Sequence, residues 1–147
     1  PASNAAQDSL RQLLVEDEEV SRLSAQVMLT RLGYEVVSAK DGQAAVEAFR
    51  QGGFHCVLMD IQMPVMNGEE ATRALRTLEQ QQGLPRTRVI ALTAYAMPGD
   101  RETFLASGMD DYVTKPVLPA ALLLALRRIK RSGQQRAKGQ ADAKAHD

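Results

Sequence analysis

Short hydrophobic runs recur along the chain and are separated by longer segments of mixed character. Most of the runs are continuous rather than alternating, which is typical of strands that are covered on both faces. The runs lie at 13–15, 36–37, 56–59, 89–92 and 112–113. We therefore predict five strands in a sheet with helices on both sides.

The segments between the runs show hydrophobic residues at helical spacing, together with residues that favour helix ends. Glycine commonly follows the last turn of a helix, small polar residues cap the start, and proline suits the first turn. The predicted helices are one that ends at Gly33, one capped by Asp41, one with the capping box Asn67 and Glu70, one from Pro98 to Gly108, and one from Pro119 to about residue 130.

Five strands that alternate with five helices predict an α/β fold. Its strands would be parallel and joined by right-handed crossovers, with a helix layer on each face of the sheet. In open sheets of this kind, function gathers in the crevice at the carboxyl ends of the strands. The residues that follow each hydrophobic run are therefore the first candidates for a site.

Chemically active side chains follow four of the five runs. Glu16 and Asp17 follow the first run, Asp60 the third, Thr93 the fourth and Lys115 the fifth. Because the carboxyl ends of parallel strands meet at one edge of the sheet, we expect three carboxylates, a hydroxyl and an ammonium to lie together there.

Three neighbouring carboxylates repel one another unless a cation offsets them or some remain protonated. Oxygen ligands suit Mg²⁺ better than Zn²⁺, and with the metal present a carboxylate can attack phosphorus. Lys115 would place a positive charge on one phosphoryl oxygen, and Thr93 would donate a hydrogen bond to another. The residues therefore predict a site that forms and holds an acyl phosphate on Asp60.

Each residue also has an ordinary structural explanation. Asp17 can cap the helix that follows, with Glu18 and Glu19 favouring the helix dipole. Asp60 can serve the turn after its strand. We favour the site because four separate strand ends supply mutually compatible groups.

Composition narrows the class of protein. The 147 residues are 44% hydrophobic and 24% charged, which suits one soluble globular domain. Eighteen basic residues balance eighteen acidic ones, so charge gives no reason to expect direct contact with nucleic acid or a membrane. The single cysteine, Cys56, cannot form an internal disulfide, which favours the cytoplasm, and no hydrophobic run is long enough to span a bilayer.

The hydrophobic pattern places the folded domain at about residues 11–130. A polar segment precedes it at 1–10. The segment at 131–147 is rich in Gly, Gln, Ala and Lys and is predicted to be a disordered tail. The first residue is Pro1 rather than Met, as expected for a piece of a longer polypeptide.

Four stretches together make the chain resemble the response regulator receiver domain of bacterial two-component signalling, over roughly residues 11–130. They are Leu-Leu-Val-Glu-Asp at 13–17, Val-Leu-Met-Asp-Ile-Gln-Met-Pro-Val-Met-Asn-Gly at 57–68, Ala-Leu-Thr-Ala at 91–94 and Asp-Tyr-Val-Thr-Lys-Pro at 111–116. The resemblance implies a flavodoxin-like α/β/α sandwich with strand order 2-1-3-4-5. It also implies that a phosphohistidine donor phosphorylates Asp60.

The resemblance assigns a metal site and one unusual peptide bond. It implies that Asp17, Asp60 and the backbone carbonyl of Gln62 hold Mg²⁺, with Glu16 acting mainly through a water molecule. It also implies a cis peptide bond before Pro116, where the cost of the cis form is small.

The resemblance further implies a switch. Phosphorylation would draw Thr93 toward the new phosphoryl group, and Tyr112 would move into the space that Thr93 leaves. The surface formed by the helix at about 98–107, the last strand and the helix at about 119–130 would then change shape.

Finer features favour one branch of the family. The stretches at 82–87 and 97–102 resemble receivers of hybrid sensor histidine kinases, so the parent chain would be a protein histidine kinase, anchored in a membrane in some cases. The domain itself would accept and lose its own phosphoryl group, and its partner would be a histidine kinase or a histidine phosphotransfer protein. A stand-alone single-domain response regulator remains the alternative, and the oligomeric state is open.

Three other classes of protein fit the sequence less well. A phosphohydrolase of the haloacid dehalogenase type needs a second Asp two residues after its nucleophile, where this chain has Gln62. A receiver-like scaffold that never carries phosphate predicts that an essential pocket residue is missing, and none is. A flavodoxin would bind its cofactor's phosphate after the first strand, where this chain has acidic residues.

Overall fold

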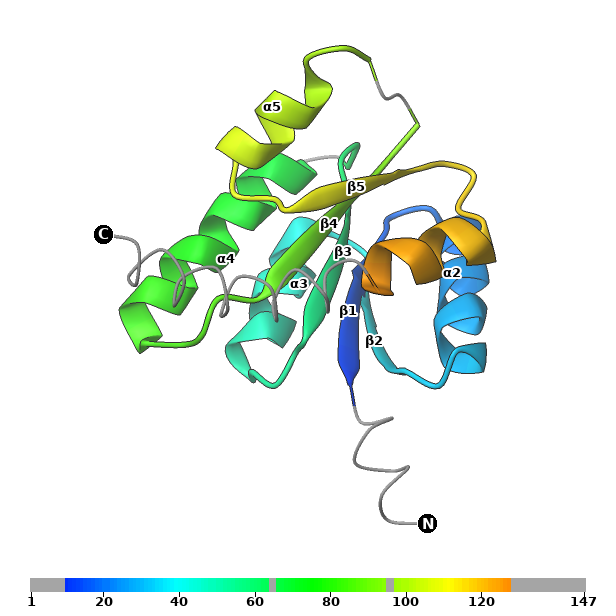
Figure 1. Ribbon diagram of the computed structural model, residues 1–147. Helices are drawn as coiled ribbons and strands as arrows, with labels where there is room; N and C mark the ends of the chain where they lie inside the picture. The colour runs from blue at the N-terminus through cyan, green and yellow to red at the C-terminus, as the bar shows by residue number, and fades with distance from the viewer. Residues whose placement is uncertain (1–9, 64–65, 95–96, 128–147) are drawn as a thin grey trace, which may run out of the picture.

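A parallel sheet of five strands, in the order β2-β1-β3-β4-β5, forms the centre of the molecule (Figure 1). It is seen in a computed structural model that describes residues 10–63, 66–94 and 97–127. The strands are β1 (Arg11–Val15), β2 (Glu35–Ala39), β3 (Cys56–Asp60), β4 (Arg88–Thr93) and β5 (Asp111–Thr114). The predicted fold class and strand order are confirmed.

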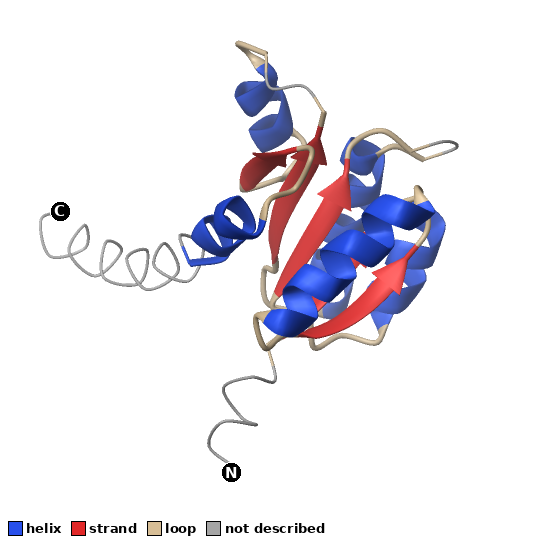
Figure 2. Cartoon of the chain, turned by 90° about the vertical axis from the view of Figure 1, so that its right-hand side faces the viewer, coloured by secondary structure: helices blue, strands red, loops and turns tan. Residues whose placement is uncertain are grey.

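Helices cover both faces of the sheet (Figure 2). They are α2 (Glu19–Arg31), α3 (Gly42–Arg50), α4 (Gly68–Gln82), α5 (Asp100–Ala106) and a last helix described over residues 119–127. One hydrophobic cluster joins the sheet to α3, α4 and α5, and a second joins it to α2 and the last helix. The chain is therefore a three-layer α/β/α sandwich.

The continuous hydrophobic runs arise because both faces of the inner strands are buried. Leu13 and Val57 belong to the cluster under α3 and α4, whereas the next residues, Leu14 and Leu58, belong to the cluster under α2. Successive side chains of a strand point to opposite faces, so a strand between two helix layers needs hydrophobic residues at every position.

Most of the predicted helix starts agree with the structure. Asp41 accepts a hydrogen bond from the backbone of Ala44 at 2.7 Å, and Asn67 accepts one from Glu70 at 2.9 Å. The predicted start at Pro98 is wrong by two residues, because α5 begins at Asp100. Gly99 has a left-handed backbone with φ of 94°, which stops a helix from running through it and leaves Pro98 in the preceding turn.

The predicted tail at 131–147 and nearly all of the N-terminal segment at 1–10 lie outside the described residues. Among the helices that the structure describes, none combines the length and the hydrophobicity needed to cross a bilayer.

Candidate functional site

Three carboxylates meet at the carboxyl ends of β1 and β3. Glu16, Asp17 and Asp60 each offer an oxygen that lies within 4.8 Å of the others. They converge because β1 and β3 are paired in parallel, with Val15 opposite Met59, so both strands end at the same edge. Glu16 and Asp60 are buried, at 1% and 2% exposure, while Asp17 is exposed. The predicted acidic cluster is therefore present.

Lys115 brings a positive charge to this cluster from the end of β5. Its Nζ lies 2.7 Å from Glu16 Oε1 and 3.2 Å from Asp60 Oδ1. Its backbone N–H donates to the carbonyl of Thr93 at 2.7 Å, which ties the end of β5 to the end of β4. The bond between Lys115 and Pro116 is cis, as the resemblance implies.

The environment alters the acidity of the pocket groups. Burial, together with the hydrogen bond and charge of Glu16, raises the pKa of Asp60 to about 6. Partial burial and the neighbouring Asp60 also raise the pKa of Asp17. Burial acts to lower the pKa of Lys115, but the carboxylates of Glu16 and Asp60 outweigh it and the pKa rises. Lys115 is therefore held in its charged form.

The donor set fits a hard divalent cation. Lys115 offsets only part of the negative charge that the three carboxylates can carry, and all of their ligand atoms are oxygen. Glu16 Oε2 is buried without a hydrogen-bond partner among the described residues. A buried carboxylate oxygen of this kind is costly unless a cation or an ordered water satisfies it.

The helix that follows β1 does not need Asp17 as its cap. Glu18 is the N-cap of α2, and its carboxylate accepts hydrogen bonds from Val20 N at 3.2 Å and Ser21 N at 2.6 Å. The alternative structural explanation for Asp17 is therefore wrong, and its side chain is available to the acidic cluster.

One supporting residue has no signal in the sequence. Arg22 Nη1 donates to the carbonyl oxygen of Glu16 at 3.0 Å and lies 3.4 Å from that of Asp17. This contact braces the turn that carries both carboxylates. Because its partners are backbone atoms, no pattern of residue types marks it.

The other predicted site residues, Gln62, Thr93 and Tyr112, lie near the carboxyl edge of the sheet or on the neighbouring strands. Gln62 N donates to Asp60 Oδ1 at 3.2 Å, and a metal-binding role for the Gln62 carbonyl stays a prediction. Thr93 is buried at the end of β4. In the pairing of β4 with β5, Ala91 lies opposite Tyr112 and Thr93 opposite Thr114, so Thr93 and Tyr112 are diagonal neighbours on one face of the sheet. Their coupling also stays a prediction.

The family is decided by a match that spans most of the chain. Residues 13–127 match the model of the response regulator receiver domain. The chain belongs to this family. The acidic cluster with Lys115 thus occupies the carboxyl edge of a receiver domain.

The receiver domain is similar to parts of much longer proteins and to one of its own size. It is 43% identical over 115 residues to the hybrid signal transduction histidine kinase I of Dictyostelium discoideum, which covers 75% of this chain and 7% of that protein. It is 45% identical over 107 residues to the sensor protein GacS of Pseudomonas syringae pv. syringae, covering 73% of this chain and 12% of that protein. It is 37% identical over 129 residues to the two-component response regulator ORR41 of Oryza sativa subsp. japonica, covering 85% of this chain and 98% of that protein.

Solved structures show the same fold. The receiver domain of the sensor histidine kinase PA1611 from Pseudomonas aeruginosa, with a magnesium ion coordinated in its active-site cleft, has 41% identity and a TM-score of 0.72, over 82% of this chain and 96% of that one. The receiver domain of Ssk1 from Saccharomyces cerevisiae, crystallised with the histidine phosphotransfer protein Ypd1, has 35% identity and a TM-score of 0.73, over 78% of this chain and 83% of that one.

Proposed function

We propose that this receiver domain accepts a phosphoryl group on Asp60 from a phosphohistidine residue of a partner protein, with Mg²⁺ as cofactor. The observation that carries the proposal is the convergence of Glu16, Asp17 and Asp60 with Lys115 at one edge of the sheet of a receiver-family protein. The magnesium ion held by the PA1611 receiver supports the choice of cation.

The chain's own residues have distinct parts in the transfer. An oxygen of ionised Asp60 attacks phosphorus, the new O–P bond forms as the P–N bond breaks, and the imidazole nitrogen leaves with the electron pair. Lys115, freed from part of its contact with Asp60, pairs with a phosphoryl oxygen. Asp17, Asp60 and the Gln62 carbonyl would hold Mg²⁺, which supplies charge neutralisation at nucleophile and phosphoryl group.

The test uses a small phosphodonor so that no partner protein is needed. Incubation with acetyl phosphate and Mg²⁺ should add one phosphoryl group to the parent protein, measured by intact mass. Asp60→Asn should abolish the addition, whereas Asp100→Asn, a matched change at the first residue of α5, should not. Labelling of the Asp60→Asn variant at the parent level would disprove the assignment.

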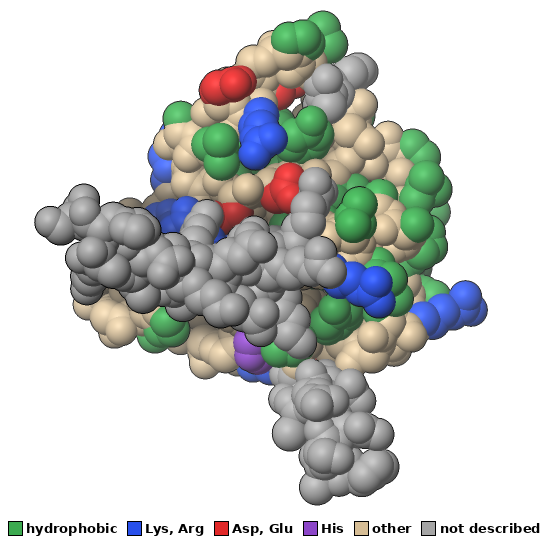
Figure 3. Space-filling model, viewed as in Figure 1, with side chains coloured by type: hydrophobic (Ala, Val, Ile, Leu, Met, Phe, Trp, Pro, Cys, Tyr) green, Lys and Arg blue, Asp and Glu red, His purple; other side chains and the backbone are tan. Residues whose placement is uncertain are grey.

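A protein partner fits the face beside the pocket. Val20, Leu23 and Val27 are exposed on α2, and Figure 3 shows hydrophobic side chains over this helix on the right of the molecule. A cavity of about 190 Å³ beside them is lined by Val20 of α2 and also by Glu16 and Lys115. Together with the complex of Ypd1 with the Ssk1 receiver, this supports a histidine phosphotransfer protein or histidine kinase as the donor.

The similarity to hybrid kinases supports the view that this chain is the receiver domain of such a kinase. The chain spans only a small part of the length of those relatives. The full-length match to ORR41 supports the alternative, a single-domain response regulator. The rival phosphohydrolase predicts repeated turnover of p-nitrophenyl phosphate, which the receiver does not. The sequence of the full-length gene distinguishes a hybrid kinase from a single-domain response regulator. A turnover assay with p-nitrophenyl phosphate tests the phosphohydrolase.

A further inference from the structure

Gly42, in the first turn of α3, lies against the loop that follows Asp60. It is buried, and a Cβ atom at this position would lie 2.9 Å from Met66 Sδ, 3.0 Å from Cγ and 3.1 Å from Cβ. Its backbone is not among the glycines with positive φ. The glycine is therefore required for space at this position and not for an unusual backbone conformation.

Met66 belongs to the loop between β3 and α4, whose described residues act on Asp60 directly. Gln62 N donates to Asp60 Oδ1 at 3.2 Å. At the far end of the loop, Gly68 N donates to Ile61 O at 3.1 Å, and a Cβ on Gly68 would collide with the Asp60 carbonyl oxygen. Met66 is two positions before Gly68, so a shift of Met66 would bear on the contacts that Gly68 makes with the backbone of Asp60 and Ile61.

We propose that Gly42 is a positioning residue for Asp60, because the space it leaves for Met66 sets where the loop after β3 sits. The structural part of this inference stands alone, while its effect on phosphorylation rests on the proposed function. Gly42 and the phosphorylation site belong to different elements, so α3 takes part in the geometry of a site to which it supplies no reactive group.

The direction of the effect separates this role from a general effect on folding. Alanine is favoured over glycine in helices by up to about 1 kcal/mol, so helix propensity gives no reason for Gly42→Ala to destabilise α3. Met66 Cβ is fixed to the backbone, and side-chain rotation cannot relieve the 3.1 Å contact. The backbone at Met66 or at the start of α3 must give by a few tenths of an ångström, and placing reacting groups wrongly by even ~1 Å can cost up to ~100-fold in rate.

The experiment compares the parent with Gly42→Ala, Met66→Ala and the double variant, and with Gln43→Ala as a control for an exposed change in the same helical turn. Amide NMR in the absence of Mg²⁺ reports the Ile61 and Gln62 resonances, and intact mass reports the rate of labelling by acetyl phosphate. Gly42→Ala should displace both resonances and slow labelling roughly 3- to 10-fold. The double variant should match Met66→Ala, because truncating Met66 restores the space.

Each result decides the inference. Parent-like resonances and rate in Gly42→Ala would overturn it, as would a defect that persists when Met66 is also shortened. If Gly42→Ala does not fold, Met66→Ala and the double variant are compared: agreement within about twofold supports the inference, and a larger difference contradicts it. If the parent itself is not labelled, the proposed function fails, and the Ile61 and Gln62 resonances alone decide the role of Gly42.

Discussion

Lys115 donates a 2.7 Å hydrogen bond to Glu16 although the two residues are 99 positions apart in the sequence. The ammonium group also lies 3.2 Å from Asp60, so it is shared between a buried carboxylate and the proposed phosphoacceptor. Glu16 therefore does more than the resemblance alone implies, because it anchors the lysine that is proposed to pair with the phosphoryl group.

Glu16→Gln should lower the pKa of Asp60 in the metal-free protein. The substitution removes the neighbouring charge that, after burial, helps to raise the Asp60 pKa to about 6, and it leaves Lys115 free to pair more closely with Asp60. Carboxyl-carbon NMR across a pH titration measures the change. An Asp60 titration at the same or a higher pH than in the parent would contradict this account.

Magnesium affinity should fall at acidic pH. The pKa of Asp60 lies above its unfolded value, so Asp60 keeps its proton up to about pH 6, and the ion must displace that proton to bind. The apparent affinity should be nearly constant well above pH 6 and decrease by up to about tenfold per pH unit below it. Calorimetric titrations at several pH values test this, and a flat profile would show that Asp60 does not compete with the proton.

Leu23→Asp should slow phosphoryl transfer from a phosphohistidine protein and leave labelling by acetyl phosphate unchanged. Leu23 is 52% exposed on α2 beside the pocket, where a charge would oppose a hydrophobic contact. The expected loss is about tenfold or more, as for a central interface residue. Leu105→Asp on α5, at 46% exposure, is the matched control. Equal loss in both variants would show that the effect is not specific to α2, and no loss in Leu23→Asp would place the partner elsewhere.

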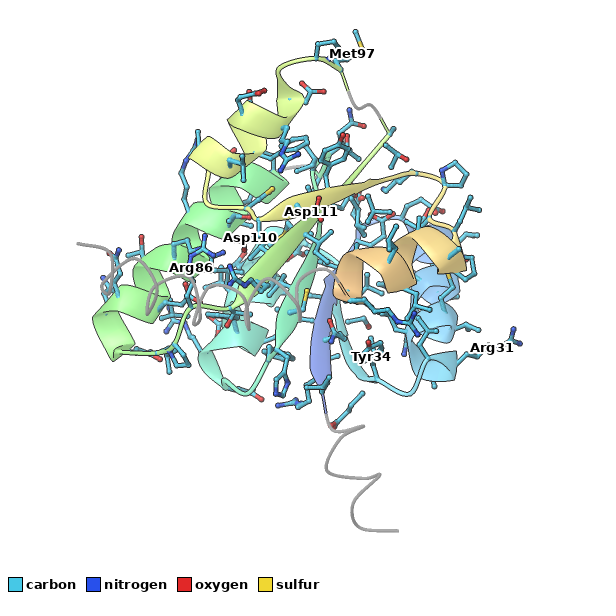
Figure 4. The ribbon with its side chains drawn as sticks, in the orientation of Figure 1. Arg31, Tyr34, Arg86, Met97, Asp110 and Asp111 are labelled. Atoms are coloured by element: carbon cyan, nitrogen blue, oxygen red, sulfur yellow. The ribbon has the colours of Figure 1, made fainter. Side chains whose placement is uncertain are left out.

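Asp110→Ala should lower the free energy of unfolding by about 3 kcal/mol. The substitution would leave the arginine side chains around Asp110 without the carboxylate that pairs with them. The Asp110 carboxylate, only 7% exposed, pairs with Arg76, Arg86 and Arg88 and accepts the Val89 amide. Figure 4 shows Arg86 and Asp110 side by side. Urea unfolding measures the loss, and a change below about 1 kcal/mol would contradict the assigned role.

The longer pair of Arg11 with Glu35, in which the Glu35 side chain is exposed, provides the contrast for that experiment. Its atoms are 3.8 Å apart and the Glu35 side chain is 59% exposed, so Glu35→Ala should cost no more than about 0.5 kcal/mol.

The Thr93→Ala variant should still accept a phosphoryl group on Asp60. The resulting conformational change at α5, β5 and the last helix should be smaller than in the parent. The proposed switch needs the Thr93 hydroxyl to move toward the phosphoryl oxygens, with Tyr112 following. Tyr112 packs against Phe104 of α5, with ring centroids 6.1 Å apart, so its movement would be felt in that helix. Amide NMR with an acyl-phosphate mimic should show smaller shifts over residues 98–127, and full-sized shifts would disprove the coupling.

The sequence predicted the positions of the reactive groups better than the contacts between them. Glu16, Asp17, Asp60 and Lys115 could be placed together because strand order and strand ends follow from hydrophobic runs. The brace from Arg22 could not be foreseen, because its partners are carbonyl groups that every residue carries.

The same limit explains two other differences. Arg76 donates to the Gly108 carbonyl as well as to Asp110, and such a contact across 32 positions follows no local pattern. The sequence places the start of α5 two residues too early, because proline suits a turn as well as a first helical position and the conformation of Gly99 decides between them.

The position of the Asp110 network has a mechanical consequence for β5. This strand is at the edge of the sheet and pairs only with β4, and its amino end is held by the arginines around Asp110. Its carboxyl end is held as well, because Lys115 N donates to the Thr93 carbonyl at 2.7 Å. A pull on the Lys115 side chain would therefore act on the ends of β4 and β5 together, next to Thr93, while the arginines keep the amino end of β5 in place.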